Sequence, residues 1–577
     1  MASRQPLQPM DLTSLRAALV EWRAQLLPSR FEKAQQPEAQ AIQLALRSLS
    51  GLHWLQLSWQ PEAARLHRIE APPRQGEGST LAQQLQHGLR GLALVEIRQN
   101  GWERVVELGF ARRPGEALER WLVVELMGRH SNLLLLDHQR QVISLARQVK
   151  PSQSRLRPIG TGDAYSTPPP LAGEPPRLAE RQESWRRRLS LLPLPLGKAL
   201  LGAYQGVSPA LVDQLLVPEQ RHLPVQQLEQ ADWDQLWRRW CQWLEAVEQE
   251  RFGWQAHGSG YRCWSPGPAS ASNGSTCSSG GCSSGGCGGG GCGGGWSLNQ
   301  ALASYYGTRL AQRRQQQRRQ QLQHALEQAI DRERRREREQ QLLLEATGSS
   351  DALQRQADGL LSQLAPSKGC IEEAQRLYRR ARKLRRAVEA IQQRLVLHRQ
   401  RLAALEASLT YLEQADSAAA LDAIAQELAA LEGQGRRSGA RSTAGEGLPS
   451  PLELQTPGGL TVQVGRNHRQ NEWISLRQAR RGDLWFHAQE LPGSHVVLKS
   501  SAAPAADGDL QLAADLAAHF SRGRGNARVP VVMVPAHDLQ RIPAAAPGTV
   551  RHRGGAVLWG EPQRAAAALG AAPSLPP

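Results

Sequence analysis

The sequence LRRAVEAIQQRLVLHRQRLAALEASLTYL spans residues 384–412 and carries a regular apolar repeat. The repeat alternates spacings of four and three residues through Leu384, Val388, Ile391, Leu395, His398, Leu402, Leu405, Leu409 and Leu412. These spacings place the side chains along one face of a helix, which is the seam of a coiled coil. His398 is interpreted as a tolerated polar residue in that seam rather than as a ligand.

The helical pattern extends on both sides of this seam, over residues 297–434. It is interrupted near TGSSDA (residues 347–352) and again near APSKG (residues 365–369). Such breaks let a second helix fold back on the first. We therefore expect an arm, defined as an antiparallel coiled-coil hairpin over residues 297–434, with its tip near residues 347–370.

Much of the chain's positive charge lies on this arm. The whole chain has 70 Lys and Arg against 53 Asp and Glu, a net charge of +17, which favours a polyanion or an anionic membrane face as partner. Between Tyr305 and Leu405 there are 22 Lys and Arg against 11 Asp and Glu. The segment DRERRRERE fits a solvated helix face with i,i+4 pairs, whereas RRQQQRRQQ and YRRARKLRR lack compensating acids. The latter two favour contact with phosphates.

Two β-hairpins are expected before residue 176. VEIRQNGWERVVEL (residues 95–108) has alternating runs on either side of Asn100-Gly101, a turn dipeptide. RWLVVELMGRHSNLLLLD (residues 120–137) places two β-rich runs around a polar loop from Met127 to Asn132. A Pro-rich stretch near residues 166–176 reads as a linker.

The segment LGKALLGAYQGVSPALVDQLL (residues 196–216) sets Gly206 and Pro209 between two short amphipathic segments. This arrangement suits a helix-hairpin-helix, whose glycine-containing turn lets backbone amides approach a phosphate. A plain helical turn fits the same residues about equally well.

A Gly/Ser/Cys-rich stretch follows, with Cys277, Cys282, Cys287 and Cys292 repeating every five residues. Zinc sites favour closer pairs of ligands in a fold that pre-organises them, so a flexible insert is the preferred interpretation. The odd count of seven cysteines argues against a disulfide framework. With no apolar run long enough to span a bilayer and no apolar stretch of a signal peptide at the N-terminus, we expect a cytoplasmic protein.

A compact α/β domain is expected from about Leu452, after the linker GQGRRSGARSTAGEG. In the strand around DLWFHA, Asp483, Trp485 and His487 share one face, which predicts a polar and aromatic outer side.

No catalytic constellation is evident. Ser494 and His495 are sequence neighbours, which does not build a nucleophile-base pair, and no G-x-S-x-G, P-loop or H-E-x-x-H motif occurs. His487 and His495 lack a carboxylate or Cys at ligand spacing, so neither a metal nor another cofactor is expected. We predict a protein that is not an enzyme.

Several blocks, in chain order, resemble the NFACT family, which includes bacterial RqcH, eukaryotic NEMF-type factors and proteins filed as fibronectin-binding protein A. MDLTSL, RFEKAQQP, WERVVEL and VELMGRHSNLLLLD look like its N-terminal domain. SLNQALASYY and IEEAQRLYRRARKLRRA resemble its coiled-coil arm, and VQVGRNHRQNEWISLRQARRGDLWFHAQELPGSHVVLK resembles its RNA-binding module, NFACT-R. Because the first block begins at Met10, the resemblance implies Met10 as the natural start.

The resemblance implies an α+β multidomain protein with a glycosylase-like N-terminal α/β domain, a helix-hairpin-helix, a long antiparallel coiled-coil hairpin and a C-terminal α/β NFACT-R domain. The expected domains are NFACT-N at 10–176, the helix-hairpin-helix at 177–255, a disordered insert at 256–296, the arm at 297–434, a linker at 435–450 and NFACT-R at 451–565.

The function implied is ribosome-associated quality control. Family members bind a large ribosomal subunit, through its rRNA, while it still carries peptidyl-tRNA. They recruit charged tRNA, in bacteria chiefly tRNA-Ala, and untemplated residues are added to the nascent C-terminus by the peptidyl-transferase centre. A small RNA-binding protein of the same pathway is a further implied partner, and no membrane is implied.

The resemblance also implies site residues. The tRNA-binding and tailing set is Glu103, Arg104, Glu125, Met127, Gly128, Arg129, His130, Ser131 and Asn132, with Glu103 where the family often has Asp. The RNA-binding set of the C-terminal module is Gly465, Arg466, Asn467, Arg469, Asn471, Asp483, Trp485, His487, Pro492, Gly493, Ser494 and His495. The rRNA-contacting set of the arm is Arg379, Arg380, Arg382, Lys383, Arg385 and Arg386.

Two other functions compete with this one. The older family name suggests a fibronectin-binding surface adhesin, which would need an export signal that the sequence does not offer. The glycosylase-like domain suggests a DNA repair enzyme, but that enzyme depends on an N-terminal Pro-Glu pair, and this chain has Met-Ala or Met-Asp.

Overall fold

The computed structural model describes residues 7–170, 172–265, 297–362, 364–365, 367–433, 450–542 and 545–571. The predictions for the four cysteines of the Gly/Ser/Cys-rich stretch and for nearly all of the linker at 435–450 lie outside the described residues. The chain divides into two compact units, residues 1–310 and residues 311–577, which are considered separately.

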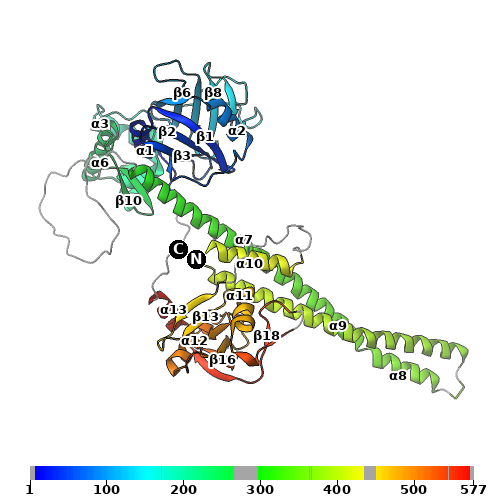
Figure 1. Cartoon of the computed structure of the whole chain (residues 1–577). Coiled ribbons are helices and arrows are strands. Elements are labelled where there is room, and N and C mark those ends of the chain that lie inside the picture. Colours follow the sequence, from blue (N-terminus) through cyan, green and yellow to red (C-terminus); the bar gives the residue numbers. More distant parts are fainter. Residues whose placement is uncertain are drawn as a thin grey trace. The chain divides into compact units, whose positions relative to one another are not determined.

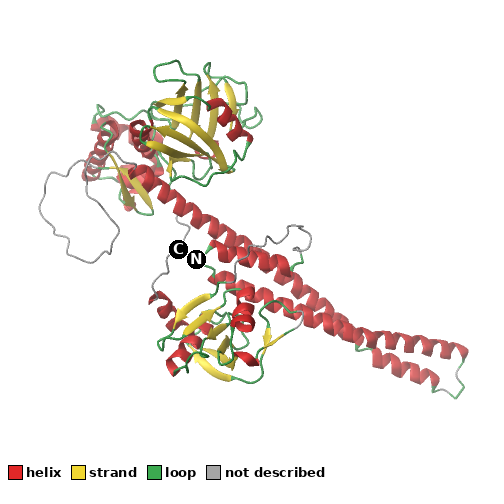
Figure 2. Cartoon of the chain, in the orientation of Figure 1, coloured by secondary structure: helices red, strands yellow, loops and turns green. Residues whose placement is uncertain are grey.

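The first unit is built on a nine-stranded antiparallel sheet (Figures 1 and 2). Its strand order is β4-β3-β2-β1-β5-β6-β7-β8-β9. The strands are β1 (Ser29–Glu38), β2 (Ala41–Ser48), β3 (Gly51–Ser58), β4 (Arg65–Ile69), β5 (Ala93–Arg98), β6 (Val105–Ala111), β7 (Arg120–Glu125), β8 (Asn132–Asp137) and β9 (Val142–Leu145). Both expected hairpins are confirmed, because β5 pairs with β6 around Gly101, at φ +57°, and β7 pairs with β8 around the Met127–Asn132 loop.

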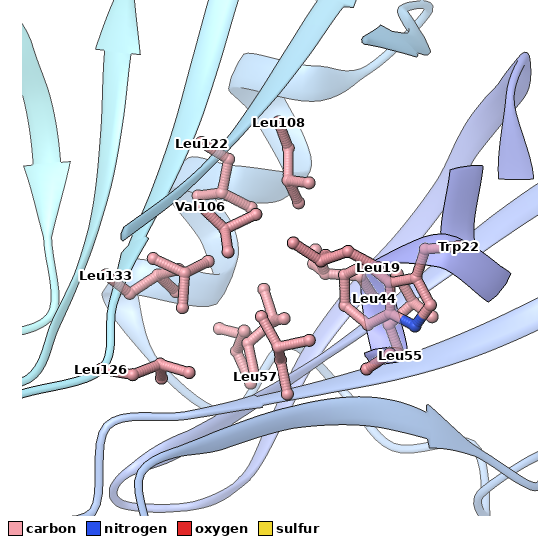
Figure 3. Packing of buried hydrophobic residues seen from close by; sticks show 14 of the residues in the cluster. Leu19, Trp22, Leu44, Leu55, Leu57, Val106, Leu108, Leu122, Leu126 and Leu133 are labelled. Carbon is pink, nitrogen blue, oxygen red and sulfur yellow. The ribbon is translucent and has the colours of Figure 1, made fainter. Parts of the chain in front are cut away.

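The main core of this unit lies between the sheet and α1 (Leu12–Leu26). Figure 3 shows Leu19 and Trp22 of α1 near Leu44, Leu55 and Leu57, and facing the side chains of β6 to β8. The helix α2 (Thr80–Leu89) adds three buried side chains to the same core. This packing holds the start of β6 and the end of β7. The candidate tRNA-binding residues lie next to these two strand ends.

Residues 7–9, which precede Met10, belong to this fold. Leu7 is buried in the main core. The Gln8 amide donates to the Tyr261 carbonyl at 2.9 Å, and its side-chain oxygen accepts from the Tyr261 N–H at 2.9 Å. A protein that began at Met10 would lack these contacts.

A helical layer completes the first unit. Its elements are α3 (Gln182–Leu189), α4 (Leu196–Ala203), α5 (Pro209–Leu215), α6 (Gln230–Glu248) and the hairpin of β10 (Phe252–His257) and β11 (Gly260–Trp264). Trp185, Trp233, Trp240 and Trp243 form the centre of its core. The insert expected from residue 256 therefore starts too early, because residues up to Trp264 form the second strand of a hairpin.

The arm consists of four helices, α7 (Ser297–Thr347), α8 (Ser350–Leu361), α9 (Lys368–Gln414) and α10 (Ala418–Leu431). The start of α7 packs in the first unit through Leu298, Leu302 and Tyr306, and the helix continues into the second. All nine predicted seam residues of α9 are buried or half-buried, which confirms the 4-3 pattern. The fold-back lies between α8 and α9, whose facing side chains include Ala357, Ala374 and Leu377.

The C-terminal module has a six-stranded sheet in the order β12-β13-β15-β14-β16-β19. Its strands are β12 (Leu452–Gln455), β13 (Thr461–Val464), β14 (Leu484–Ala488), β15 (Val496–Leu498), β16 (Val529–Pro535) and β19 (Ala556–Gly560). Its helices are α11 (His468–Glu472), α12 (Asp507–His519) and α13 (Pro562–Ala571), and a short pair, β17 (Gln540–Arg541) and β18 (Val550–Arg551), completes the module. The face carrying Phe486 packs on α12, so the multidomain α+β prediction is confirmed at this level.

The outer side predicted for β14 is corrected by the structure. Trp485 is 2% exposed, because the π-helical turn Trp473–Gln478 and the side chains of Ala536, Leu539 and Val550 cover that side of the sheet. A second apolar cluster, with Ile474, Val497 and Val534, occupies what alternation alone predicted to be surface. In the described part of the chain, no helix is both long and apolar enough to span a membrane.

Candidate nucleic-acid interface

Glu103 and Arg104 lie directly before β6, beside the loop that follows β7. The Leu126 N–H donates to the Arg104 carbonyl at 2.9 Å, and an Arg104 guanidinium nitrogen donates to the Met10 carbonyl at 3.4 Å. Because both residues precede the first regular strand position, Val105, strand alternation does not force their side chains to opposite faces. The hairpin thus brings the predicted pair next to the predicted loop.

The electrostatics around Arg104 are set by burial and two acids. Burial lowers the pKa of the Arg104 guanidinium, and the charges of Asp11 and Glu103 oppose that shift. Asp11 is held in place, since its carboxylate accepts from the Ser14 N–H at 2.9 Å and from the Ser208 hydroxyl at 2.8 Å. Sequence reasoning missed Asp11, although an Asp three residues before Ser14 at the start of a helical pattern is a capping signal.

The turn between α4 and α5 packs against the same segment. At Gly206, at φ +72°, a Cβ atom would lie 2.8 Å from Leu12 and 2.8 Å from the Trp102 ring. Only glycine fits there, so the expected helical turn approaches the residue that precedes Glu103. The Trp102 ring also contacts Arg16, whose guanidinium lies 4.7 Å from the ring centroid.

The Met127–Asn132 loop has exposed and buried members. Gly128, at φ +58°, begins a 3-10 turn, and the Met127 N–H donates to the Ser131 hydroxyl at 2.8 Å. Asn132 is buried and donates to the Arg147 carbonyl at 2.9 Å. Arg129 and His130 are exposed, so these two side chains are the ones that the loop offers to a ligand.

Glu125, a member of the predicted tRNA-binding set, is buried among partners of its own chain. It is 1% exposed, and its two oxygens accept from the Arg157 guanidinium at 2.6 and 3.0 Å. The Tyr165 hydroxyl donates to the same carboxylate at 3.0 Å. With both oxygens engaged, Glu125 anchors residues 157–165 to the end of β7 rather than reaching a ligand.

The six basic residues predicted on the arm are all exposed on α9. Arg385 pairs with Asp351 at 3.0 Å. Within the described residues, the other five form no ion pair with a carboxylate, and the nearby acids Asp358 and Glu373 are engaged with Tyr378 and Arg376. This part of α9 therefore presents uncompensated positive charge, the arrangement that a phosphate backbone requires.

The predicted residues of the C-terminal module are mostly buried. Gly465, Asn467, Asn471, Asp483, Trp485, Gly493, Ser494 and His495 are buried, Arg466, His487 and Pro492 are half-buried, and Arg469 is exposed. Burial prevents most of these side chains from contacting RNA directly. Their role as a nucleic-acid surface stays a prediction for Arg469 and the half-buried members.

Several of these residues join the module to the base of the arm. The Asn471 amide donates to the Tyr411 hydroxyl at 2.8 Å, and that hydroxyl donates to the Gly493 carbonyl at 3.1 Å. Arg466 pairs with Asp416 at 2.8 Å, and the Arg469 N–H donates to Glu427 at 2.9 Å. The GRN and PGSH motifs therefore hold the module against α9 and α10.

Two neighbouring histidines of the module, His487 and His495, are neutral at physiological pH. Burial lowers the pKa of His487 to about 4, and burial together with the charge of His487 lowers the pKa of His495 well below its usual value. The His487 ring stacks on Trp485 with centroids 5.5 Å apart. Within the described residues, no three His, Cys, Asp or Glu side chains are grouped as metal ligands would be.

Comparison with known proteins agrees with this organisation. The family model of the NFACT N-terminal and middle domains matches residues 11–364 and 361–442, and that of the NFACT protein RNA binding domain matches residues 452–554. The protein named Rqc2 homolog RqcH from Streptococcus suis (strain 05ZYH33) is 25% identical over 563 residues, which cover 92% of this chain and 94% of that protein. The protein of the same name from Bacillus subtilis (strain 168) is 23% identical over 569 residues, with the same shares covered.

A solved structure is also similar. It is the C-terminal part of the fibronectin/fibrinogen-binding protein from Streptococcus suis, with 28% identity and a TM-score of 0.37. The similarity covers 43% of this chain and 96% of that one.

Proposed function

Because the chain belongs to the NFACT family, we propose that it acts in ribosome-associated quality control in the cytoplasm. In this proposal it binds a large ribosomal subunit that still carries peptidyl-tRNA and recruits charged tRNA, with tRNA-Ala as the expected species. The ribosome carries out peptidyl transfer, and the protein positions the substrates. The name RqcH of the curated relatives and the matched RNA-binding module support this role.

The observation that carries the proposal is the exposed basic segment of α9. Arg380, Arg382 and Arg386 lie on the long helix α9 and have no carboxylate partner among the described residues. Such a segment binds a polyanion by releasing its counterions, so it docks on folded rRNA without reading its sequence. In the first unit, Arg104 with the exposed Arg129 and His130 would then meet the recruited tRNA.

Two matched triple variants test the docking step. R380Q/R382Q/R386Q removes three unpaired charges, and R332Q/R334Q/R399Q removes three charges that pair with Glu432, Glu406 and Glu337. Affinity for purified large subunits is measured by co-sedimentation across a salt series. The first variant should weaken binding at least tenfold and lower the salt slope by about 2 to 3. The second should bind nearly as the wild type does.

Equal binding by the wild type and R380Q/R382Q/R386Q would contradict docking through α9. Equal weakening by the two triple variants would show that the net charge of the arm matters rather than this segment.

A further inference from the structure

The strand β19 lies at one edge of the sheet in the C-terminal module, and one of its faces is exposed. On the side that carries Trp485, the covering segments reach Val532 and Val534 but leave the strand β19 bare. Val557 and Trp559 of β19 are 50% and 58% exposed. Within the described residues, no other aromatic ring contacts Trp559, and an exposed tryptophan on a sheet face is uncommon without a partner.

The pairing register shows which side chains share this face. Trp559 is opposite Pro530, and Val557 is opposite Val532, which is in turn opposite His487 on β14. Directly opposed residues of antiparallel strands point to the same side. Trp559 and Val557 therefore form a continuous apolar and aromatic surface with the half-buried Pro530 and His487, which we term the β19 platform.

The surroundings of the β19 platform are strongly basic. Residues 522–553 contain six Arg and a single acid, Asp538. Arg528 precedes β16 at one end of the platform, where it is 67% exposed while it contacts Glu561 at 3.1 Å. Arg551 and Arg553 precede β19 at the other end, are exposed, and form no ion pair in the part of the chain that the structure describes.

The edge of the sheet is less suited to a ligand than its face. The strand β19 has only five residues, and Gly554 and Gly555, at φ +67° and +126°, bend the chain away before it. The Trp559 carbonyl already accepts from the Gln511 amide at 2.9 Å. A protein strand that paired with this edge would find few open backbone groups.

We propose that the β19 platform is a stacking site for the bases of single-stranded RNA, with Arg528, Arg551 and Arg553 contacting the phosphates on either side. A flat aromatic ring between cationic side chains is the arrangement by which proteins bind single strands without reading their sequence. A base stacks on Trp559, and His487, being neutral, adds apolar contact rather than charge. Val557 and Trp559 lie beyond residue 554, where the match to the family's RNA-binding domain ends.

This inference rests on the proposed function, because it assigns an RNA strand to the same module. It differs in what it requires, since docking through α9 would persist if the β19 platform bound nothing.

The test uses the full-length protein and a single-stranded RNA oligonucleotide containing 4-thiouridine. After irradiation and digestion with trypsin, the peptide of residues 554–564, whose only aromatic residue is Trp559, should carry the crosslinked nucleotide. Trp559→Ala should remove this crosslink and weaken binding of the oligonucleotide about tenfold, and Trp559→Phe should restore most of both. The R551Q/R553Q variant should lower the salt slope by about 1 to 2 while the crosslink persists.

Trp254→Ala, which removes a 36% exposed tryptophan of the first unit, is the matched control and should bind as the wild type does. The same oligonucleotide annealed to its complement should not respond to Trp559→Ala. An unchanged crosslink pattern and affinity in Trp559→Ala would overturn the inference. If large subunits still co-sediment in that case, the proposed function stands without the platform.

Discussion

Arg104 is the residue on which the candidate tRNA site depends most. The charges of Asp11 and Glu103 act on its guanidinium, which donates to the Met10 carbonyl before α1. Its carbonyl accepts from the N–H of Leu126, directly before the Met127–Asn132 loop. Burial lowers the pKa of its guanidinium, but an arginine stays charged at every pH at which proteins fold. It therefore offers a fixed cation at the edge of a half-buried site.

We expect Arg104→Ala to abolish untemplated tailing while subunit association is largely retained. In the proposed function, the arm supplies the association with the subunit and Arg104 positions the tRNA. Tail formation is measured by mass spectrometry of the C-termini of nascent polypeptides, and association by co-sedimentation. Arg112→Ala, which removes an exposed arginine directly after β6, is the control and should leave both unchanged.

Parallel loss of tailing and association in Arg104→Ala would show that Arg104 only maintains the fold.

At the residue scale, the sequence motifs located the candidate segments but not the contacts of each side chain. Glu125 lies within the predicted motif, yet its partners Arg157 and Tyr165 are 32 and 40 residues further along the sequence. No local pattern reveals an ion pair between residues so far apart.

The environment of the strand β14 depends on the segments that pack over one of its faces. Its alternation is regular, and Trp485 and His487 share a side as expected. The turn Trp473–Gln478 then buries that side, and the loop before β15 brings His495 to within 5.4 Å of His487, measured between ring centroids. The result is a pair of neutral histidines beside Trp485, of which His495 is buried and His487 is half-buried.

This pair of histidines should make the module less stable in acid. An unfolded histidine binds a proton below its ordinary pKa of about 6.5, whereas folded His487 does so only below about 4. Between these values the unfolded state binds more protons, so the free energy of opening falls as the pH falls, by about 1.4 kcal/mol per pH unit for each such histidine. Hydrogen exchange of β14 and β16, corrected for its intrinsic pH dependence, measures this.

His487→Gln should flatten the dependence of the opening free energy on pH. An equal dependence in wild type and variant would contradict the lowered pKa of His487.

Among the elements, the coiled-coil seam and both hairpins could be predicted because spacing and turn residues are local signals. The contacts of Asn471 and Gly493 with Tyr411 join residues 60 and 82 positions apart. The packing of the turn Trp473–Gln478 over β14 is likewise a tertiary contact. These contacts depend on tertiary packing, which a single sequence does not encode in any local period.

At the scale of the whole molecule, each unit presents a different surface. The first offers Arg104, Arg129 and His130 around one hairpin, and the second offers the basic segment of α9 and the C-terminal module. Charge and the seam pointed to the arm, because each is a property summed over many residues, whereas the residues of the first surface came from the family resemblance. The proposal assigns tRNA to the first surface and rRNA to the second.

The most direct test of this account is to purify the tagged protein from cytosol at moderate salt and sequence the RNA that accompanies it. The account predicts enrichment of large-subunit rRNA together with peptidyl-tRNA, and loss of both in R380Q/R382Q/R386Q. Recovery of no ribosomal RNA with the wild-type protein would contradict it.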